Sequence, residues 1–211
     1  MNAVSPQRRY AWISIFLIVL IWSGIGPKDY PTWFLEVFPA VLGGAVLWYT
    51  RDIFSLTRLV YVLILIHCII LMVGGHYTYA EVPLFDWLKD ALDLERNNYD
   101  KVGHFVQGFV PAMVAREIVI RHGVFNYVGW RDFFIICFCL GFSAFYELIE
   151  WLVAEASEEA ADAFLGTQGY VWDTQSDMAY ALAGAVIALA VLGRIHDGQL
   201  ETNGFIARQA G

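Results

Sequence analysis

The sequence predicts an all-α fold, a polytopic membrane helix bundle of about six transmembrane helices with short interfacial helices in the outer loops. Hydrophobic residues make up 58% of the 211 residues and charged residues only 16%, whereas soluble domains hold roughly 45–50% and about 25%. Six apolar segments approach the length of about 20 residues that a helix needs to cross a bilayer. The positive charges, finally, are distributed unequally between the two sides of these segments. This composition excludes a soluble enzyme and a disordered protein.

The six predicted spans follow one another along the chain. They cover residues 10–26, 33–50, 58–75, 102–120, 132–154 and 176–193. The first follows Arg8 and Arg9 and so resembles a signal peptide, but a Pro-Lys-Asp run at 27–29 takes the place of a cleavage pattern. We therefore expect a retained anchor. Residues 1–194 are predicted to form a single six-span domain, and residues 195–211 a short cytoplasmic tail.

The positive charges predict how the bundle is oriented, because cytoplasmic loops carry an excess of Lys and Arg. One side holds nine of them: Arg8, Arg9, Arg51, Arg58, Arg116, Arg121, Arg131, Arg194 and Arg208. The other side holds four: Lys28, Lys89, Arg96 and Lys101. The protein is therefore expected to lie in a bacterial inner membrane with both termini on the cytoplasmic side.

Two long loops lie on the predicted outer side. Residues 81–95 place Leu84, Leu88 and Leu92 on one helical stripe, which is typical of a short helix lying in the membrane interface. Residues 155–165 are expected to form another short helix that is acidic on one side.

Ionisable side chains gather at the outer ends of the spans. Asp100 and His104 open the fourth span at i,i+4 and therefore share a helix face, on which Gln107 lies one turn deeper. Glu147 and Glu150 lie at i,i+3 near the outer end of the fifth span. Each pair faces one way along its helix, so we expect the two helices to present these groups together.

The sixth and third spans add polar residues at the same boundary. Asp173 and Asp177 open the sixth span at i,i+4, and His76 and Glu81 follow the third. Glu36, near the outer start of the second span, is expected to be an interfacial acid.

A set that mixes histidine with carboxylates is the ligand inventory for Zn, Mn or Fe, whereas Mg and Ca prefer oxygen alone. Helix bundles build such sites from facing helices. We predict Asp100, His104 and Asp177 as ligands of a divalent metal ion, with Glu147 and His104 as catalytic acid–base groups. Substrate contacts or supporting contacts are expected from Glu150, Asp173, Gln107, His76 and Glu81.

A simpler interpretation of the same residues stays open. Polar side chains at span ends normally meet head groups and water, and acids at a helix start are stabilised by the helix dipole. That alone accounts for Asp100, Asp173 and Asp177. Under this interpretation the protein is a six-helix anchor without a site.

Four sequence runs carry a resemblance to a known family. They are HYTYAEVP at 76–83, YDKVGHFVQGF at 99–109, YELIEW at 146–151 and GTQGYVWDTQSDM at 166–178. The chain resembles the YjdF-like family of bacterial inner-membrane proteins over essentially its whole length. The resemblance implies a location and a topology, and it implies no reaction.

A more distant resemblance is to the VanZ-like membrane proteins, which are linked to glycopeptide-antibiotic resistance. It rests on Asp100 and Lys101 followed by His104, and on Asp177 in the sixth span, and covers roughly 100–190. The chain departs from that pattern at Ala181, where the family has Asn, and around Gln168, where an Arg is expected. These departures argue against carrying over the resistance function.

Three functions are compatible with these observations. The first is a membrane enzyme, a hydrolase or transferase that uses a divalent metal ion on a lipid head group or lipid-linked substrate. The second is a non-catalytic assembly or interaction protein. The third is a small proton-coupled transporter with a polar path through His67, Gln107 and Glu117. The lipid bilayer is the one partner that the sequence implies. A net charge of -8 argues against binding of nucleic acid. The sequence does not determine the oligomeric state.

Overall fold

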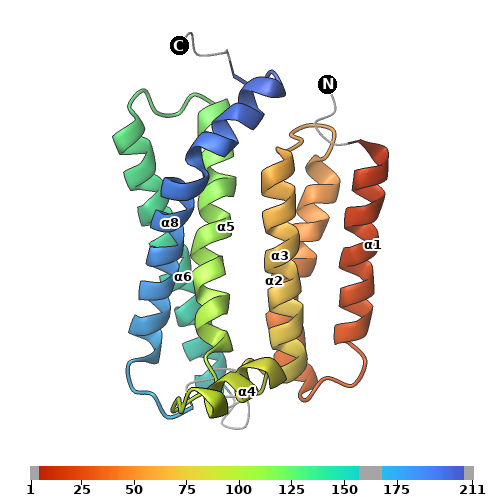
Figure 1. Ribbon diagram of the computed structural model, residues 1–211, viewed down its shortest axis with the longest axis vertical. Helices are drawn as coiled ribbons and strands as arrows, with labels where there is room; N and C mark the ends of the chain where they lie inside the picture. Colours follow the sequence, from red (N-terminus) through yellow and green to blue (C-terminus); the bar gives the residue numbers. More distant parts are fainter. Residues whose placement is uncertain (1–4, 157–167, 207–211) are drawn as a thin grey trace.

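The chain folds into a bundle of helices, seen in the computed structural model, which describes residues 5–156 and 168–206. The described residues contain no strand. The helices are α1 (Pro6–Ser23), α2 (Tyr30–Thr50), α3 (Arg58–Tyr77), α4 (Pro83–Ala91), α5 (Tyr99–Arg121), α6 (Val128–Ala156) and α8 (Asp173–Thr202). The six long helices run alongside one another, and the short α4 crosses one end of the bundle (Figure 1). The predicted fold class is confirmed.

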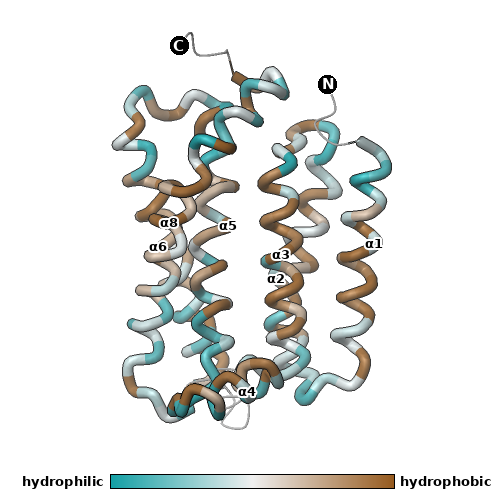
Figure 2. Tube along the Cα trace, viewed as in Figure 1, coloured by the Kyte–Doolittle hydropathy of each residue, from teal (hydrophilic) through white to brown (hydrophobic). Residues whose placement is uncertain are grey.

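Each predicted span coincides with one long helix. Among the described residues, four helices are long and apolar enough to cross a membrane, namely α2, α3, α6 and α8. Helices α1 and α5 do not reach that hydropathy, although they stand beside the other four (Figure 1). Hydrophobic residues occupy the middle of the long helices and hydrophilic ones gather toward the two ends (Figure 2). The arrangement is that of a helical membrane bundle, and the number of six crossings stays a prediction.

The long helices form two groups of three that meet at α3. Helices α1, α2 and α3 enclose a core around Phe16, Val37 and Met72. A second core around Met113 and Ala185 fills the space among α3, α5, α6 and α8. Contacts between α3 and α5 join the groups, so one polar site can draw side chains from both.

The short helix α4 confirms the predicted helix in the first long outer loop. Phe85 packs edge-on against Tyr99 with 5.2 Å between ring centroids, which fixes α4 over the bundle end. Leu84, Trp87 and Leu92 point away from the bundle and are exposed, as expected of an amphipathic helix at a membrane surface. The second predicted loop helix, 155–165, overlaps the last two residues of α6 and otherwise lies outside the described residues.

The predicted boundary of the C-terminal tail differs from the structure. Helix α8 continues to Thr202, so residues 195–202 are helical. The reason is packing, because His196 and Leu200 are fully buried and the Gln199 side chain accepts a hydrogen bond from the Leu59 backbone N–H at 2.9 Å. Polar residues of this segment form hydrogen bonds with other helices of the bundle. The polarity of the sequence alone does not reveal these partners.

Helices α5 and α8 form the most extensive contact in the bundle. A Cβ atom added to Gly108 would overlap the carbonyl oxygen of Ala181, and one added to Gly184 would overlap that of Phe105. The two backbones therefore touch, as small residues allow in membrane helices. This approach brings the first turns of α5 and α8, with their acids, face to face.

We expect Gly108→Ala and Gly184→Ala each to destabilise the protein by about 3 kcal/mol or more, because a backbone overlap cannot be relieved by turning a side chain. Gly141→Ala on α6 is the matched control, since nothing lies within 4 Å of the added Cβ. Its stability should stay within about 1 kcal/mol of the wild type. Thermal unfolding in detergent, followed by tryptophan fluorescence, measures all three. Equal stability of the three variants would contradict the close contact.

Candidate functional site

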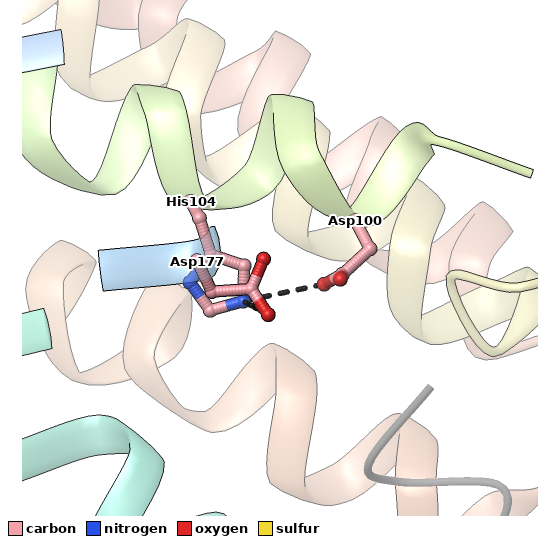
Figure 3. Close-up of side chains that lie close together, drawn as sticks. All are labelled: Asp100, His104 and Asp177. Atoms are coloured by element: carbon pink, nitrogen blue, oxygen red, sulfur yellow. Dashed lines mark ion pairs between the residues drawn. The ribbon is translucent and has the colours of Figure 1, made fainter. Parts of the chain in front are cut away.

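Three buried side chains meet where α5 and α8 begin. Asp100 and His104 come from α5 and Asp177 from α8, and their side chains point toward one another (Figure 3). His104 Nε2 lies 3.2 Å from Asp100 Oδ1 and 3.9 Å from Asp177 Oδ2. One donor atom from each residue lies within 4.8 Å of the others. We call these residues the Asp–His–Asp triad.

One separation in the triad matches that of metal ligands, whereas the His104–Asp177 separation of 3.9 Å and the overall spread of 4.8 Å are wider. Four donors placed tetrahedrally around an ion at 2.0–2.1 Å are about 3.3 Å apart, which is close to the His104–Asp100 separation of 3.2 Å. Gln107 Oε1 lies 3.1 Å from His104 Nδ1 on the other side of the ring. When the Nδ1–H donates to that oxygen, Nε2 presents its lone pair to the two carboxylates. The Gln107 contact at Nδ1 is therefore compatible with ligation through Nε2.

Helix α6 brings Glu147 and Glu150 to the same place. Both side chains are buried, and both interact electrostatically with His104 and Asp100. Glu147 Oε1 lies 3.7 Å from His104 Nδ1 and accepts no hydrogen bond from the described residues. A buried carboxylate oxygen without a donor is costly, so this atom is positioned for a ligand or a proton.

Two basic residues sit among the acids of α5 and α8. Lys101 Nζ donates to Asp173 Oδ1 and to Asp177 Oδ1, each at 2.6 Å. Arg96 donates to the same Asp173 oxygen at 2.5 Å and lies 3.4 Å from Asp100 Oδ2. Asp173 is therefore bound between two cations, which explains why it stands outside the triad.

The second helix contributes an acid that the sequence analysis placed elsewhere. Glu36 is buried, interacts electrostatically with Asp100 and His104, and accepts a hydrogen bond from Tyr146 at 3.4 Å. Glu36 was expected to be an interfacial acid and is instead buried, because the groups α1–α3 and α5–α8 meet at this end and enclose its side chain. We call Glu36, Asp100, His104, Glu147, Glu150, Asp173 and Asp177 the acid–histidine cluster.

Tyr79 reaches the cluster through an unusual piece of backbone. Thr78 and Tyr79 both have positive φ, at 59° and 52°, a region that non-glycine residues seldom adopt. A Cβ on Gly74 would strike the Tyr79 ring, and one on Gly103 would come within 2.9 Å of it. The position of the Tyr79 ring beside Glu36 therefore requires two residues with positive φ and two glycines without side chains. Burial raises the pKa of the Tyr79 phenol well above its usual value, so that it stays a hydrogen-bond donor.

The cluster carries more acids than bases. Six buried carboxyl groups meet two basic side chains, Arg96 and Lys101, among the described residues. Burying uncompensated carboxylates is unfavourable. The arrangement therefore calls for bound cations or protons.

Two residues expected in this site lie outside it. His76 Nδ1 lies 2.9 Å from the Ser23 backbone carbonyl oxygen, and its ring packs against the Trp22 ring. Because a carbonyl only accepts, His76 Nδ1 is the donor. Glu81 is exposed and pairs with Lys28. Both residues lie at the expected depth, but on the α1–α2 side of the bundle.

A second polar network occupies the opposite end of α5 and α8, and the sequence analysis missed it. Glu117 accepts hydrogen bonds from the Thr57 hydroxyl at 2.7 Å and from His196 Nε2 at 3.0 Å. Arg116 donates to His196 Nδ1 at 2.9 Å and pairs with Asp197 at 2.8 Å. We call these residues, together with Arg121, which lies 3.0 Å from Glu117, the Glu117 network. Its acids and arginines are equal in number and paired, which indicates a structural role.

The transporter hypothesis depended on polar groups through the depth of the membrane. On α5, buried Val110, Ala112 and Met113 lie between Gln107 and the Glu117 network. Along α5 the two polar ends are therefore separated by apolar side chains.

The helical bundle and its buried polar end define a class of protein: a multi-pass helical membrane protein with a cluster of acids and histidine at one end. The chain belongs to the DUF2238 family, described as a predicted membrane protein, whose sequence profile matches residues 8–198.

The chain is also similar to a curated bacterial protein, the inner membrane protein YjdF of Escherichia coli (strain K12). The two are 50% identical over 192 residues, which is 90% of each chain. No solved structure matches. The resemblance to YjdF-like proteins is thus confirmed, and the one to VanZ-like proteins stays a prediction.

Proposed function

We propose that this protein is an inner-membrane enzyme that depends on a divalent metal ion, a hydrolase or transferase acting on a lipid head group or lipid-linked substrate at the outer leaflet. The Asp–His–Asp triad carries the proposal, because its three donors converge within 4.8 Å in a buried setting. The inner-membrane location is supported by YjdF. The outward orientation is supported by the distribution of positive charges.

In this proposal Asp100, His104 and Asp177 hold the ion, which supplies Lewis-acid activation of water and of a substrate oxygen. Glu147 accepts a proton from the attacking nucleophile and returns it to the leaving group, for which its unpartnered Oε1 is available. Gln107 keeps the His104 ring in place from the side opposite Asp100.

Metal analysis of the purified full chain tests the triad. We expect about one Zn or Mn per chain in the wild type, less than about a tenth of that in His104→Ala and Asp177→Asn, and full content in Glu81→Gln. The last variant changes an acid at the same membrane depth but outside the cluster. Wild-type protein that stays free of metal after dialysis against Zn and Mn would overturn the metal centre.

Glu147→Gln tests the catalytic role separately. The variant should keep its metal, since Glu147 lies outside the triad, and lose about 10²- to 10⁴-fold in turnover. Turnover is measured as mass-spectrometric change of the lipids in reconstituted vesicles. A Glu147→Gln variant that restores a deletion strain fully would instead favour the non-catalytic interaction protein.

A further inference from the structure

The cluster has two sides, separated by the His104 ring. Nε2 faces Asp100 and Asp177, whereas Nδ1 faces Glu147. Glu36 and Glu150 interact electrostatically with each other and with His104. We call Glu36, Glu147 and Glu150 the glutamate side. A divalent ion in the triad would balance two of the four excess carboxylates, so negative charge remains to be matched there.

The glutamate side is built differently from a metal site. Among the described residues, the triad is the one group of acids and histidine whose donor atoms lie within 4.8 Å of one another. The glutamate side does not form a second such group. An ammonium group would offer these carboxylates N–H donors, each of which reaches an acceptor about 2.8 Å from the nitrogen.

An acceptor is available for such a donor. Glu147 Oε1 is buried and accepts no hydrogen bond from the described residues. Glu36, in contrast, already accepts from Tyr146 at 3.4 Å, so one donor fixes its orientation. Tyr79 is a second hydrogen-bonding neighbour of Glu36.

We propose that the glutamate side binds the primary ammonium group of the substrate, so that the substrate class is an amine-bearing head group such as that of phosphatidylethanolamine. This inference rests on the proposed function, because it places the substrate beside the same metal triad. A primary ammonium is preferred over a trimethylated one, since an unpartnered carboxylate oxygen needs an N–H donor.

Binding of short-chain lipids to the full chain in phosphatidylglycerol nanodiscs tests the proposal. The probes are dihexanoyl-phosphatidylethanolamine, its N-acetylated analogue, dihexanoyl-phosphatidylcholine and free ethanolamine. We expect the ethanolamine lipid to bind about 10-fold or more tightly than the N-acetylated analogue and the choline lipid. Comparable binding of free ethanolamine would place the source of the amine in solution and support the ammonium site equally.

Three variants locate the effect. Glu36→Gln and Glu150→Gln should reduce the preference to less than about 3-fold while the metal content stays unchanged. Glu155→Gln, the same change at an exposed acid of α6, should leave it intact. Equal affinity for the ethanolamine lipid and its N-acetylated analogue would overturn the proposal, as would a preference that survives in both cluster variants.

The experiment separates this inference from the proposed function. The amine preference is measured with and without a chelator, and it should persist in the chelator because Glu36 and Glu150 are not in the triad. A protein that binds no metal and shows no turnover, but still prefers the amine, would refute the proposed enzyme and leave the ammonium site standing. A metal-loaded protein without that preference would refute the ammonium site alone.

Discussion

Replacing Glu117 by alanine is expected to lower the free energy of unfolding by about 3–5 kcal/mol. The carboxylate is fully buried and accepts from the Thr57 backbone N–H at 2.9 Å, the Thr57 hydroxyl at 2.7 Å, Arg121 at 3.0 Å and His196 at 3.0 Å. Alanine would leave these donors buried without acceptors, and a charged guanidinium would lose a partner. Because Thr57 precedes α3, the loop between α2 and α3 would also lose its hydrogen bonds to Glu117, and the bond from Arg121 to the Ser55 carbonyl would remain.

Denaturation in detergent micelles, followed by tryptophan fluorescence, measures this loss. Asp197→Asn is the control from the same network, since this acid is 45% exposed and pairs with Arg116 alone among the described residues. It should cost less than about 1 kcal/mol. Glu117→Gln, which keeps the shape and one acceptor, should fall between the two. If Glu117→Ala were as stable as Asp197→Asn, the network would not be structural.

The helices were predictable from the sequence because length and hydropathy determine them locally. Helices α2, α3, α6 and α8 each contain a stretch of apolar residues of bilayer length, whereas α1 and α5 fall below that hydropathy and still stand beside them. The start of α8 was likewise predictable from Asp173 and Asp177. Its end was not, because the residues that extend it to Thr202 are buried by contacts with α3 and α5.

The site was predictable where residues share a helix. Asp100 with His104 and Glu147 with Glu150 follow from helical spacing, and the triad combines the first pair with Asp177. Spacing gives the depth of a side chain and its face, but not its neighbours around the bundle. His76 therefore shares the depth of the cluster and lies outside it.

The same limitation hid two other parts of the molecule. Glu36 joins the cluster from a helix that is distant in sequence, through contacts that no local pattern encodes. Glu117 and His196 meet across 79 positions of the chain. For Glu36, the available sequence signal was a single acid inside a predicted span. For the Glu117 network, the signal was the adjacent charges of Arg116 and Glu117, which also lie inside a predicted span.

Lys101→Met is expected to make the stability of the protein depend on metal. The wild-type ammonium binds Asp173 and Asp177 at 2.6 Å each and lies 3.5 Å from Asp100. Without it, three buried carboxylates lose a shared cation, and the metal-free protein should be destabilised by about 3–5 kcal/mol. A divalent ion at Asp100 and Asp177 would replace that positive charge, so added Mn or Zn should recover a large part of the loss.

The decisive measurement compares the metal-induced rise in Tm of Lys101→Met with that of the wild type. At a concentration 100-fold above Kd, binding to the folded state contributes about 2.7 kcal/mol, and the variant should gain more than the wild type because Lys101 no longer competes for Asp177. Lys28→Met is the control, an identical change in the exposed pair with Glu81. It should lose less than about 1 kcal/mol and respond to metal as the wild type does. An equal metal response in Lys101→Met and the wild type would contradict this prediction. It would mean that Lys101 and the metal ion do not compete for the Asp177 carboxylate.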